Sequence, residues 1–125
     1  MKLQPDRMEV QSVTGYGPGW LAIQGEKIHT SLLITSAGLR RPLSARTPQA
    51  LLASDFAALA ELPVELVIYG SGARLQFPPA AWLAPLMAKR IGLETMDTEA
   101  ACRTYNILAG EGRDVAALLL LPEHP

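Results

Sequence analysis

The chain has little of what most catalytic and metal sites require. Among its 125 residues it has one cysteine, Cys102, and two histidines, His29 and His124. A single cysteine excludes an internal disulfide and a zinc site built from several cysteines, and two histidines argue against a histidine-rich metal site. We therefore expect no metal ion and no cofactor, and the sequence shows no recognisable catalytic motif.

The chain also lacks an excess of charge of either sign. Eleven lysines and arginines stand against 12 aspartates and glutamates, which gives a formal net charge of -1 at pH 7. Proteins that bind nucleic acid or an anionic membrane surface usually carry a basic excess. This balance predicts no nucleic-acid partner.

Long apolar runs are missing as well. The longest run, 115–121, is far shorter than the roughly 20 residues that a membrane-spanning helix needs. The opening residues MKLQPD lack the apolar core of a signal peptide, so we expect no membrane span and a cytoplasmic location. With 49% hydrophobic residues, a chain of this length suits a single domain, residues 1–125, around one core.

The first third of the chain has the pattern of an antiparallel β-meander. Short β-branched and apolar stretches alternate with turn-rich ones such as Gly15-Tyr16-Gly17-Pro18-Gly19. The segment 36–47 shows no clean period, and its glycine, proline and three arginines predict an exposed loop. The strands of the meander are expected at 8–13, 20–23 and 27–35.

The remainder of the chain alternates helices and strands. This alternation favours parallel strands joined by right-handed crossovers. The sequence therefore predicts an α/β domain of three layers, with a mixed central sheet, antiparallel N-terminal strands and a βαβαβ-like C-terminal half. The expected elements are a helix from an N-cap at Ser54 to Leu62, a strand over 64–69, a helix ending near Ile91, a strand over 93–96, a helix from Asp97 or Thr98 to about Gly110, and a strand over 115–121.

Pro85 leaves two courses open for the middle helix. A proline inside a helix removes a backbone hydrogen bond, so the helix either kinks there or begins at Ala84 with Pro85 in its first turn. Gly92 is expected to cap the carboxyl end of this helix, and Gly112 suits the left-handed position after the next one.

Two glycine-rich segments invite comparison with phosphate-binding loops. Residues 15–19 resemble part of a dinucleotide fingerprint, but they precede a strand, whereas that fingerprint opens a helix, so a plain turn explains them better. Gly70-Ser71-Gly72 follows a buried strand, where backbone N–H groups can converge on an anion. A tight turn is the alternative explanation for this second segment.

Polar residues gather near the start of the last helix. Capping accounts for Asp97 or Thr98 only, which leaves the other polar side chains as candidates for ligand recognition. Cys102 is interpreted as a small buried residue because no histidine is close in sequence to activate its thiol. Gly70-Ser71-Gly72 and Asp97-Thr98 each follow a strand that is predicted to be parallel to the other, so we expect these two segments to share one functional surface. The candidate residues for a ligand or partner are Gly70, Ser71, Gly72, Asp97, Thr98, Arg103, Thr104 and Asn106.

Three elements in the C-terminal half carry a family resemblance: ETMDT at 94–98, ACRTYNIL at 101–108 and EGR at 111–113. With the glycine, hydroxyl, glycine loop at 70–72, they resemble the domain of unknown function 498 family. That family occurs in bacteria and archaea and includes a mitochondrial complex I assembly factor and an adipogenesis-associated protein. The resemblance covers residues 64–121. Ser71 stands where threonine is more usual, and Leu43 stands where tryptophan is common.

The resemblance implies a three-layer α/β fold and no established enzyme activity. It favours a non-enzymatic, assembly-factor-like domain that acts through protein–protein contact, with a role in the biogenesis of a respiratory complex. The sequence does not specify the protein partner. The alternative is an enzyme or ligand-binding domain for a small anionic molecule, held in a crevice between Gly70-Ser71-Gly72 and the helix start at Asp97-Thr98.

Overall fold

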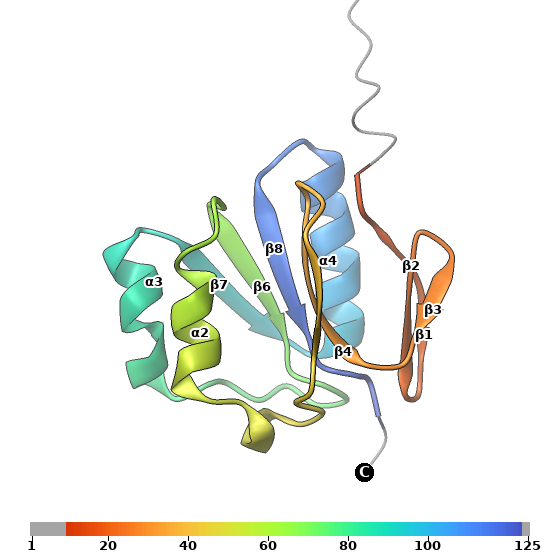
Figure 1. Cartoon of the computed structure of the whole chain (residues 1–125), viewed down its shortest axis with the longest axis horizontal. Helices are drawn as coiled ribbons and strands as arrows, with labels where there is room; N and C mark the ends of the chain where they lie inside the picture. The colour runs from red at the N-terminus through yellow and green to blue at the C-terminus, as the bar shows by residue number, and fades with distance from the viewer. Residues whose placement is uncertain (1–9, 124–125) are drawn as a thin grey trace, which may run out of the picture.

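The computed structural model describes residues 10–123, which form two sheets and their covering helices (Figure 1). A five-stranded mixed sheet has the order β5-β4-β8-β6-β7, and a separate three-stranded sheet has the order β1-β2-β3. The strands are β1 (Val13–Gly17), β2 (Trp20–Ile23), β3 (Glu26–Ile28), β4 (Ser31–Thr35), β5 (Arg40–Leu43), β6 (Leu66–Gly70), β7 (Gly92–Met96) and β8 (Val115–Leu119). The helices are η1 (Pro48–Ala50), α2 (Ala53–Leu59), η2 (Ala80–Leu83), α3 (Ala84–Ala88) and α4 (Thr98–Gly110), with η marking 3-10 helices.

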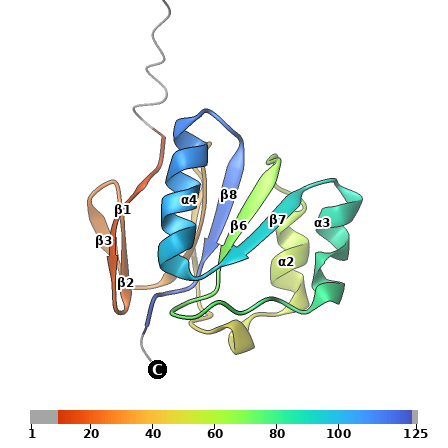
Figure 2. The same cartoon turned by 180° about the vertical axis from the view of Figure 1, so that it is seen from behind.

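The central sheet is mixed, as predicted. Strand β6 pairs in parallel with both β7 and β8, while β4 pairs antiparallel with β5 and β8. The chain passes outward from β6 to β7 through α3, and then returns past β6 to β8 through α4. Right-handed crossovers in opposite directions place their helices on opposite faces of a sheet. Figures 1 and 2 show α2 and α3 on one face and α4 on the other.

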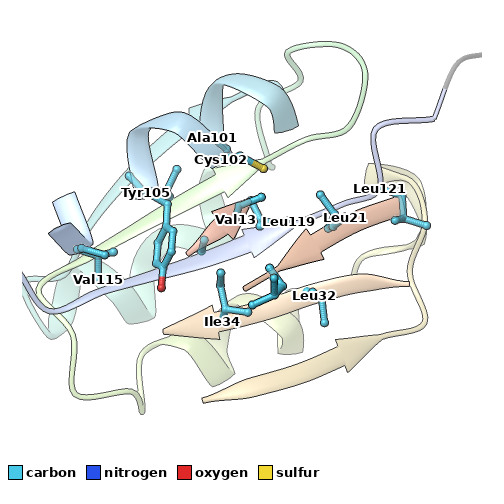
Figure 3. Packing of buried hydrophobic residues seen from close by; sticks show 14 residues of the cluster. Val13, Leu21, Leu32, Ile34, Ala101, Cys102, Tyr105, Val115, Leu119 and Leu121 are labelled. Atoms are coloured by element: carbon cyan, nitrogen blue, oxygen red, sulfur yellow. The ribbon is translucent and has the colours of Figure 1, made fainter. Parts of the chain in front are cut away.

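Alternation along the central strands divides the buried side chains between these faces. In β8, Val115, Ala117 and Leu119 pack toward α4 and the three-stranded sheet, while Ala116 and Leu118 pack toward α2 and α3. Figure 3 shows the first cluster, which is formed by residues of α4, among them Tyr105, together with residues of β1, β2, β4 and β8. Side chains on both faces of a central strand must be apolar, which explains the continuous run at 115–121.

The N-terminal meander is present, but its first and third strands differ from the prediction. The first strand was expected at 8–13 and a turn at 15–19, whereas β1 runs from Val13 to Gly17 and only the next two residues form the turn. Residues 27–35 divide into β3, which pairs with β2, and β4, which pairs with β5 and β8 of the other sheet. The chain changes sheets between Ile28 and Ser31. Met8, which was expected in the first strand, lies outside the described residues.

Segment 36–47 also differs from its prediction as a loop, because its residues 40–43 form β5. This strand lies at the edge of the sheet and pairs on one side only. An edge strand tolerates Pro42, whose missing N–H can face away from its partner. The two arginines and the proline of β5 therefore led to the prediction of a loop at a place where the chain forms a strand.

The helix boundaries correct four further expectations, one of which is that α2 ends at Leu59 and not at Leu62. Helix α2 begins at Ala53, and Ser54 lies in its first turn; the Leu52 N–H donates to Oδ2 of Asp55 (2.7 Å) at this end. Helix α3 begins at Ala84 with Pro85 in its first turn, which settles the two alternatives for that proline. It ends at Ala88, and Gly92 begins β7 and caps no helix.

Candidate functional site

Asp97 caps α4, the helix that begins within the second candidate segment. Its Oδ1 accepts a hydrogen bond from the N–H of Ala100 (2.9 Å), while its backbone stays extended. Glu99 lies in the first turn, where its negative charge suits the positive end of the helix. Of the two residues that could have capped α4, Asp97 does so, and Thr98 is the first helical residue.

Thr98 joins the start of α4 to the loop that follows β6. Its side chain is fully buried; Oγ1 donates to the carbonyl of Leu120 (2.6 Å) and accepts from the N–H of Gly72 (2.9 Å). The N–H of Thr98 in turn donates to the carbonyl of Gly72 (2.8 Å). The two predicted segments therefore meet beside the carboxyl ends of β6 and β7. Hydrogen bonds join them directly at the place where a crevice between them was expected.

Gly70 and Gly72 are explained by this close contact. A Cβ atom on Gly70 would lie 3.0 Å from both the Cβ of Ala101 and the Cα of Thr98, so any larger residue would push α4 away from β6 by a few tenths of an ångström. Gly72 has a φ of 100°, in the region that favours glycine. Tight packing and a tight turn account for both glycines without a bound anion.

Ser71 fixes the shape of the loop at 71–77. Its hydroxyl donates to the carbonyl of Arg74 (2.6 Å) and accepts from the N–H of Gln76 (2.9 Å). Its N–H donates to the carbonyl of Met96 (2.9 Å), and only 3% of the residue is exposed. The hydroxyl predicted for ligand contact thus holds the backbone of its own loop.

Arg103 and Asn106 face the meander and lie apart from this loop. The amide of Asn106 makes two hydrogen bonds to the backbone of Val13: Oδ1 accepts from its N–H and Nδ2 donates to its carbonyl, both at 2.8 Å. Nη1 of Arg103 donates to Oη of Tyr16 (3.0 Å). Thr104 is half-buried on the same helix. Arg103 and Asn106 therefore lie away from the place where the two candidate segments meet, and the functional role of all eight candidate residues stays a prediction.

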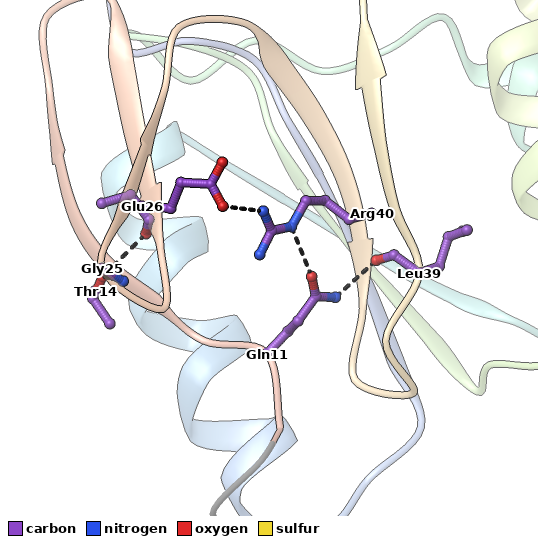
Figure 4. A network of polar contacts seen from close by, with 7 residues as sticks. Gln11, Thr14, Gly25, Glu26, Leu39 and Arg40 are labelled. Atoms are coloured by element: carbon purple, nitrogen blue, oxygen red, sulfur yellow. Dashed lines mark hydrogen bonds and ion pairs between the residues drawn. The ribbon is translucent and has the colours of Figure 1, made fainter.

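A polar network around Gln11, just before β1, was not predicted. Gln11 is buried, and its Nε2 donates to the carbonyl of Leu39 (2.8 Å), while its Oε1 accepts from Nε of Arg40 (3.1 Å) (Figure 4). Arg40 also pairs with Glu26 of β3 at 2.9 Å. These contacts tie the three-stranded sheet to β4 and β5. Nothing in the sequence near Gln11 distinguishes it from a solvent-exposed glutamine.

A pocket of about 390 Å³ opens where β6 and β8 end. Ser71 and Gly72 form part of its wall, whereas Asp97 and Thr98 do not line it. Two guanidinium groups line it: Nε of Arg46 pairs with Oε2 of Glu123 (2.9 Å), and Arg74 has no ion-pair partner within residues 10–123. The lining residues are Arg46, Thr47, Pro48, Gln49, Ser71, Gly72, Ala73, Arg74, Gln76, Leu121 and Glu123.

Cys102 is buried, as the sequence predicts. Burial raises the pKa of its thiol to about 12, although Arg103 opposes this shift. The thiol is therefore protonated at neutral pH and is poorly suited to act as a nucleophile. Within residues 10–123 no three His, Cys, Asp or Glu residues are grouped so that they could hold a metal ion. No helix in that range is long and apolar enough to cross a membrane.

Comparisons with known proteins place this geometry in a family. An uncharacterised protein of Rhodobacter capsulatus is 36% identical over 110 residues, which cover 86% of this chain and 82% of that protein. The zebrafish (Danio rerio) protein named NADH dehydrogenase [ubiquinone] 1 alpha subcomplex assembly factor 3 is 39% identical over 64 residues, which cover 51% of this chain but only 37% of that protein.

Solved structures agree with the fold. A protein from Bordetella parapertussis superposes with a TM-score of 0.83 at 32% identity, over 90% of this chain and 96% of that one. The family model described as protein of unknown function (DUF498/DUF598) matches residues 13–120, so the match includes the meander as well as the motifs at 70–72 and 94–113. The chain therefore belongs to the DUF498/DUF598 family.

Proposed function

We propose that the chain is an assembly-factor-like domain that binds another protein through the loop at 71–77, in the biogenesis of a respiratory NADH dehydrogenase. The observation that carries the proposal is the exposure of Leu75 (55%) and Phe77 (69%) on this loop. Similarity to a protein named as an NADH dehydrogenase assembly factor supports the choice of partner class.

The loop is well suited to protein contact because its backbone is already held in place. Ser71 bonds both Arg74 and Gln76, so little conformational entropy is lost when a partner covers the apolar side chains. Burial of apolar surface contributes about 25 cal/mol per Å², and aromatic side chains are frequent anchors of interfaces.

A third exposed apolar side chain lies on the adjoining segment. Nε2 of Gln49 donates to Oε1 of Gln76 (3.4 Å), which ties the short helix η1 to the loop. Leu52, directly after η1, is 63% exposed. Three large exposed apolar side chains therefore lie on, or directly after, the two segments that contribute residues to the lining of the pocket. Exposed apolar surfaces of this kind commonly mark sites of protein interaction.

The proposal can be tested with a photo-crosslinking amino acid placed at position 77. A matched probe at position 107 serves as control, because Ile107 is similarly exposed (61%) but lies on α4, away from the loop. In cells of the source organism, we expect the probe at 77 to form a covalent adduct with a subunit or assembly intermediate of NADH dehydrogenase. The probe at 107 should not form this adduct.

The physiological role has a separate readout. A strain that lacks the chain should contain less assembled NADH dehydrogenase, and the wild-type gene should restore it. A gene that carries Leu75→Ser and Phe77→Ser should restore less, provided that the variant is folded. Equal amounts of the enzyme with and without the chain would contradict the proposed role in biogenesis.

A second candidate function is the binding of a small anionic molecule, as an enzyme or as a carrier. The pocket with Arg46 and Arg74 favours it, since guanidinium groups bind carboxylates and phosphates through paired hydrogen bonds. Calorimetric titration with phosphate and citrate tests this candidate. Heat of binding that disappears in Arg74→Gln would support it, and no heat with either anion would count against it.

A further inference from the structure

We propose that the pocket at the ends of β6 and β8 binds a carboxylate side chain from an acidic, partly apolar segment of a partner protein. Arg74 receives the carboxylate, and Leu75 and Phe77 cover the neighbouring apolar side chain. This inference rests on the proposed function, because it assigns a chemistry to the surface through which the chain would bind its partner.

The charges of the pocket favour an acidic ligand. Its lining contains two arginines and one glutamate, which leaves a net charge of +1 in a chain whose own net charge is -1. Arg46 is already occupied by Glu123, whereas Arg74 offers a guanidinium without an ionic partner among the described residues. A second carboxylate therefore has one open guanidinium to bind.

The chain itself shows the chemistry that this pocket accepts. Glu123 reaches Arg46 from an irregular segment that follows β8, and this segment also contributes Leu121 to the lining. An acidic residue beside an apolar one, in a segment outside helix and strand, thus already occupies part of the pocket. A partner segment of the same chemistry can bind next to it, on Arg74.

A protein segment uses more of this surface than a small anion does. A small anion would pair with Arg74 but would leave Leu75 and Phe77 in water. A segment with an acidic and an apolar side chain satisfies both. The amides of Gln49 and Gln76 face the pocket as well, and each can donate to or accept from a peptide backbone.

The test measures fluorescence anisotropy with a labelled peptide, Gly-Glu-Leu-Glu-Phe-Gly, on the full chain. The control peptide carries glutamine at both glutamate positions, and free glutarate serves as the small carboxylate. We expect the glutamate peptide to bind at least about tenfold more tightly than the glutamine peptide. The difference should shrink as salt rises, because the arginines are partly exposed and their charges are screened.

Three variants locate the binding. Arg74→Gln should weaken binding of the glutamate peptide about tenfold, whereas Glu123→Gln should tighten it about threefold by freeing Arg46. Arg113→Gln is the matched control, since Arg113 forms a similarly exposed ion pair with Glu65 beside the amino ends of β6 and β8, away from the pocket at their carboxyl ends. It should leave binding unchanged, and circular dichroism should show that all three variants are folded.

The outcomes separate this inference from the proposed function. Equal binding of the two peptides, equal loss in Arg74→Gln and Arg113→Gln, or glutarate binding as tight as that of the peptide would each overturn the acidic-segment inference. If the adduct at position 77 still formed, the proposed function would stand without it. If the peptide bound as expected but the adduct were absent, the pocket chemistry would stand and the partner class would be wrong.

Discussion

The hydroxyl of Thr98 provides a direct test of how the loop after β6 is held to α4. In Thr98→Val the shape of the side chain is conserved, but the donor to Leu120 and the acceptor for Gly72 are lost. Both backbone groups lie in a place that water does not reach, because Thr98 is fully buried. The substitution therefore isolates two hydrogen bonds from packing.

The expected cost follows from the number of groups left unpaired. A buried polar group without a partner costs about 1–3 kcal/mol, so two of them should lower the free energy of unfolding by about 2–6 kcal/mol. For a chain of this length the entropy of unfolding converts each kcal/mol into roughly 4 °C, which predicts a fall in the melting temperature of about 8–24 °C. This is a large share of the stability of a typical domain.

The assay is thermal unfolding followed by circular dichroism, with two companion variants. Thr98→Ser keeps the hydroxyl and should lose only about 1 kcal/mol for its missing methyl group. Thr104→Val makes the same chemical change at a half-buried position of α4 and should stay within about 0.5 kcal/mol of the wild type. A Thr98→Val protein that melts within about 2 °C of the wild type would refute the reasoning, because the two bonds would then contribute nothing.

Three further predictions concern the core and the attachment of the meander. Leu118→Ala should lower the free energy of unfolding by about 2–5 kcal/mol in urea titrations, because Leu118 is fully buried against α2 and α3; a loss below about 0.5 kcal/mol would contradict its place in the core. Cys102 should react with iodoacetamide much more slowly in the native state than in urea, since burial raises its pKa to about 12, and equal rates would contradict its burial. Asn106→Leu should speed hydrogen exchange in β1 more than in β6, because both bonds to Val13 are lost; unchanged exchange in β1 would show that these bonds do not hold it.

The elements that the sequence predicts well are those whose signals are local. Strands β6 and β8 are short apolar runs bounded by turn residues, and α4 begins with an acidic cap and ends before a glycine with positive φ. Each of these signals lies within a few residues of the element that it defines. Parallel pairing then followed from the alternation of helices and strands.

The errors occur where the outcome depends on distant residues. No glycine or proline marks the change of sheet between Ile28 and Ser31, so the stretch reads as one strand. Strand β5 has no apolar pattern that would reveal it in the sequence. It is a strand because its backbone pairs with β4. In both cases the partner strands decide the structure.

The role of the polar side chains at the candidate site could not be predicted from the sequence either. A hydroxyl at Ser71 or Thr98 can face a ligand or a backbone carbonyl, and the sequence motif is the same in both cases. The pocket brings Arg46, Arg74 and Glu123 together from three separate segments. No spacing along the chain could have indicated that these three side chains share one cavity.

The way in which the meander is attached has a consequence for the order of folding. The pairings of β6 with β7 and β8 join segments closer along the chain, such as Leu66 with Gly92 and with Val115, whereas Val13 meets Asn106 across 93 residues. Closing so long a loop costs entropy before any contact compensates for it. The described hydrogen bonds between the meander and the rest of the fold each use a side chain, of Gln11, Arg40, Arg103, Tyr105 or Asn106, and these side chains can bond only once α4 and β4 are in place. We therefore expect the C-terminal half to fold as a nucleus onto which the first strands of the chain dock last, although they are the first to be synthesised.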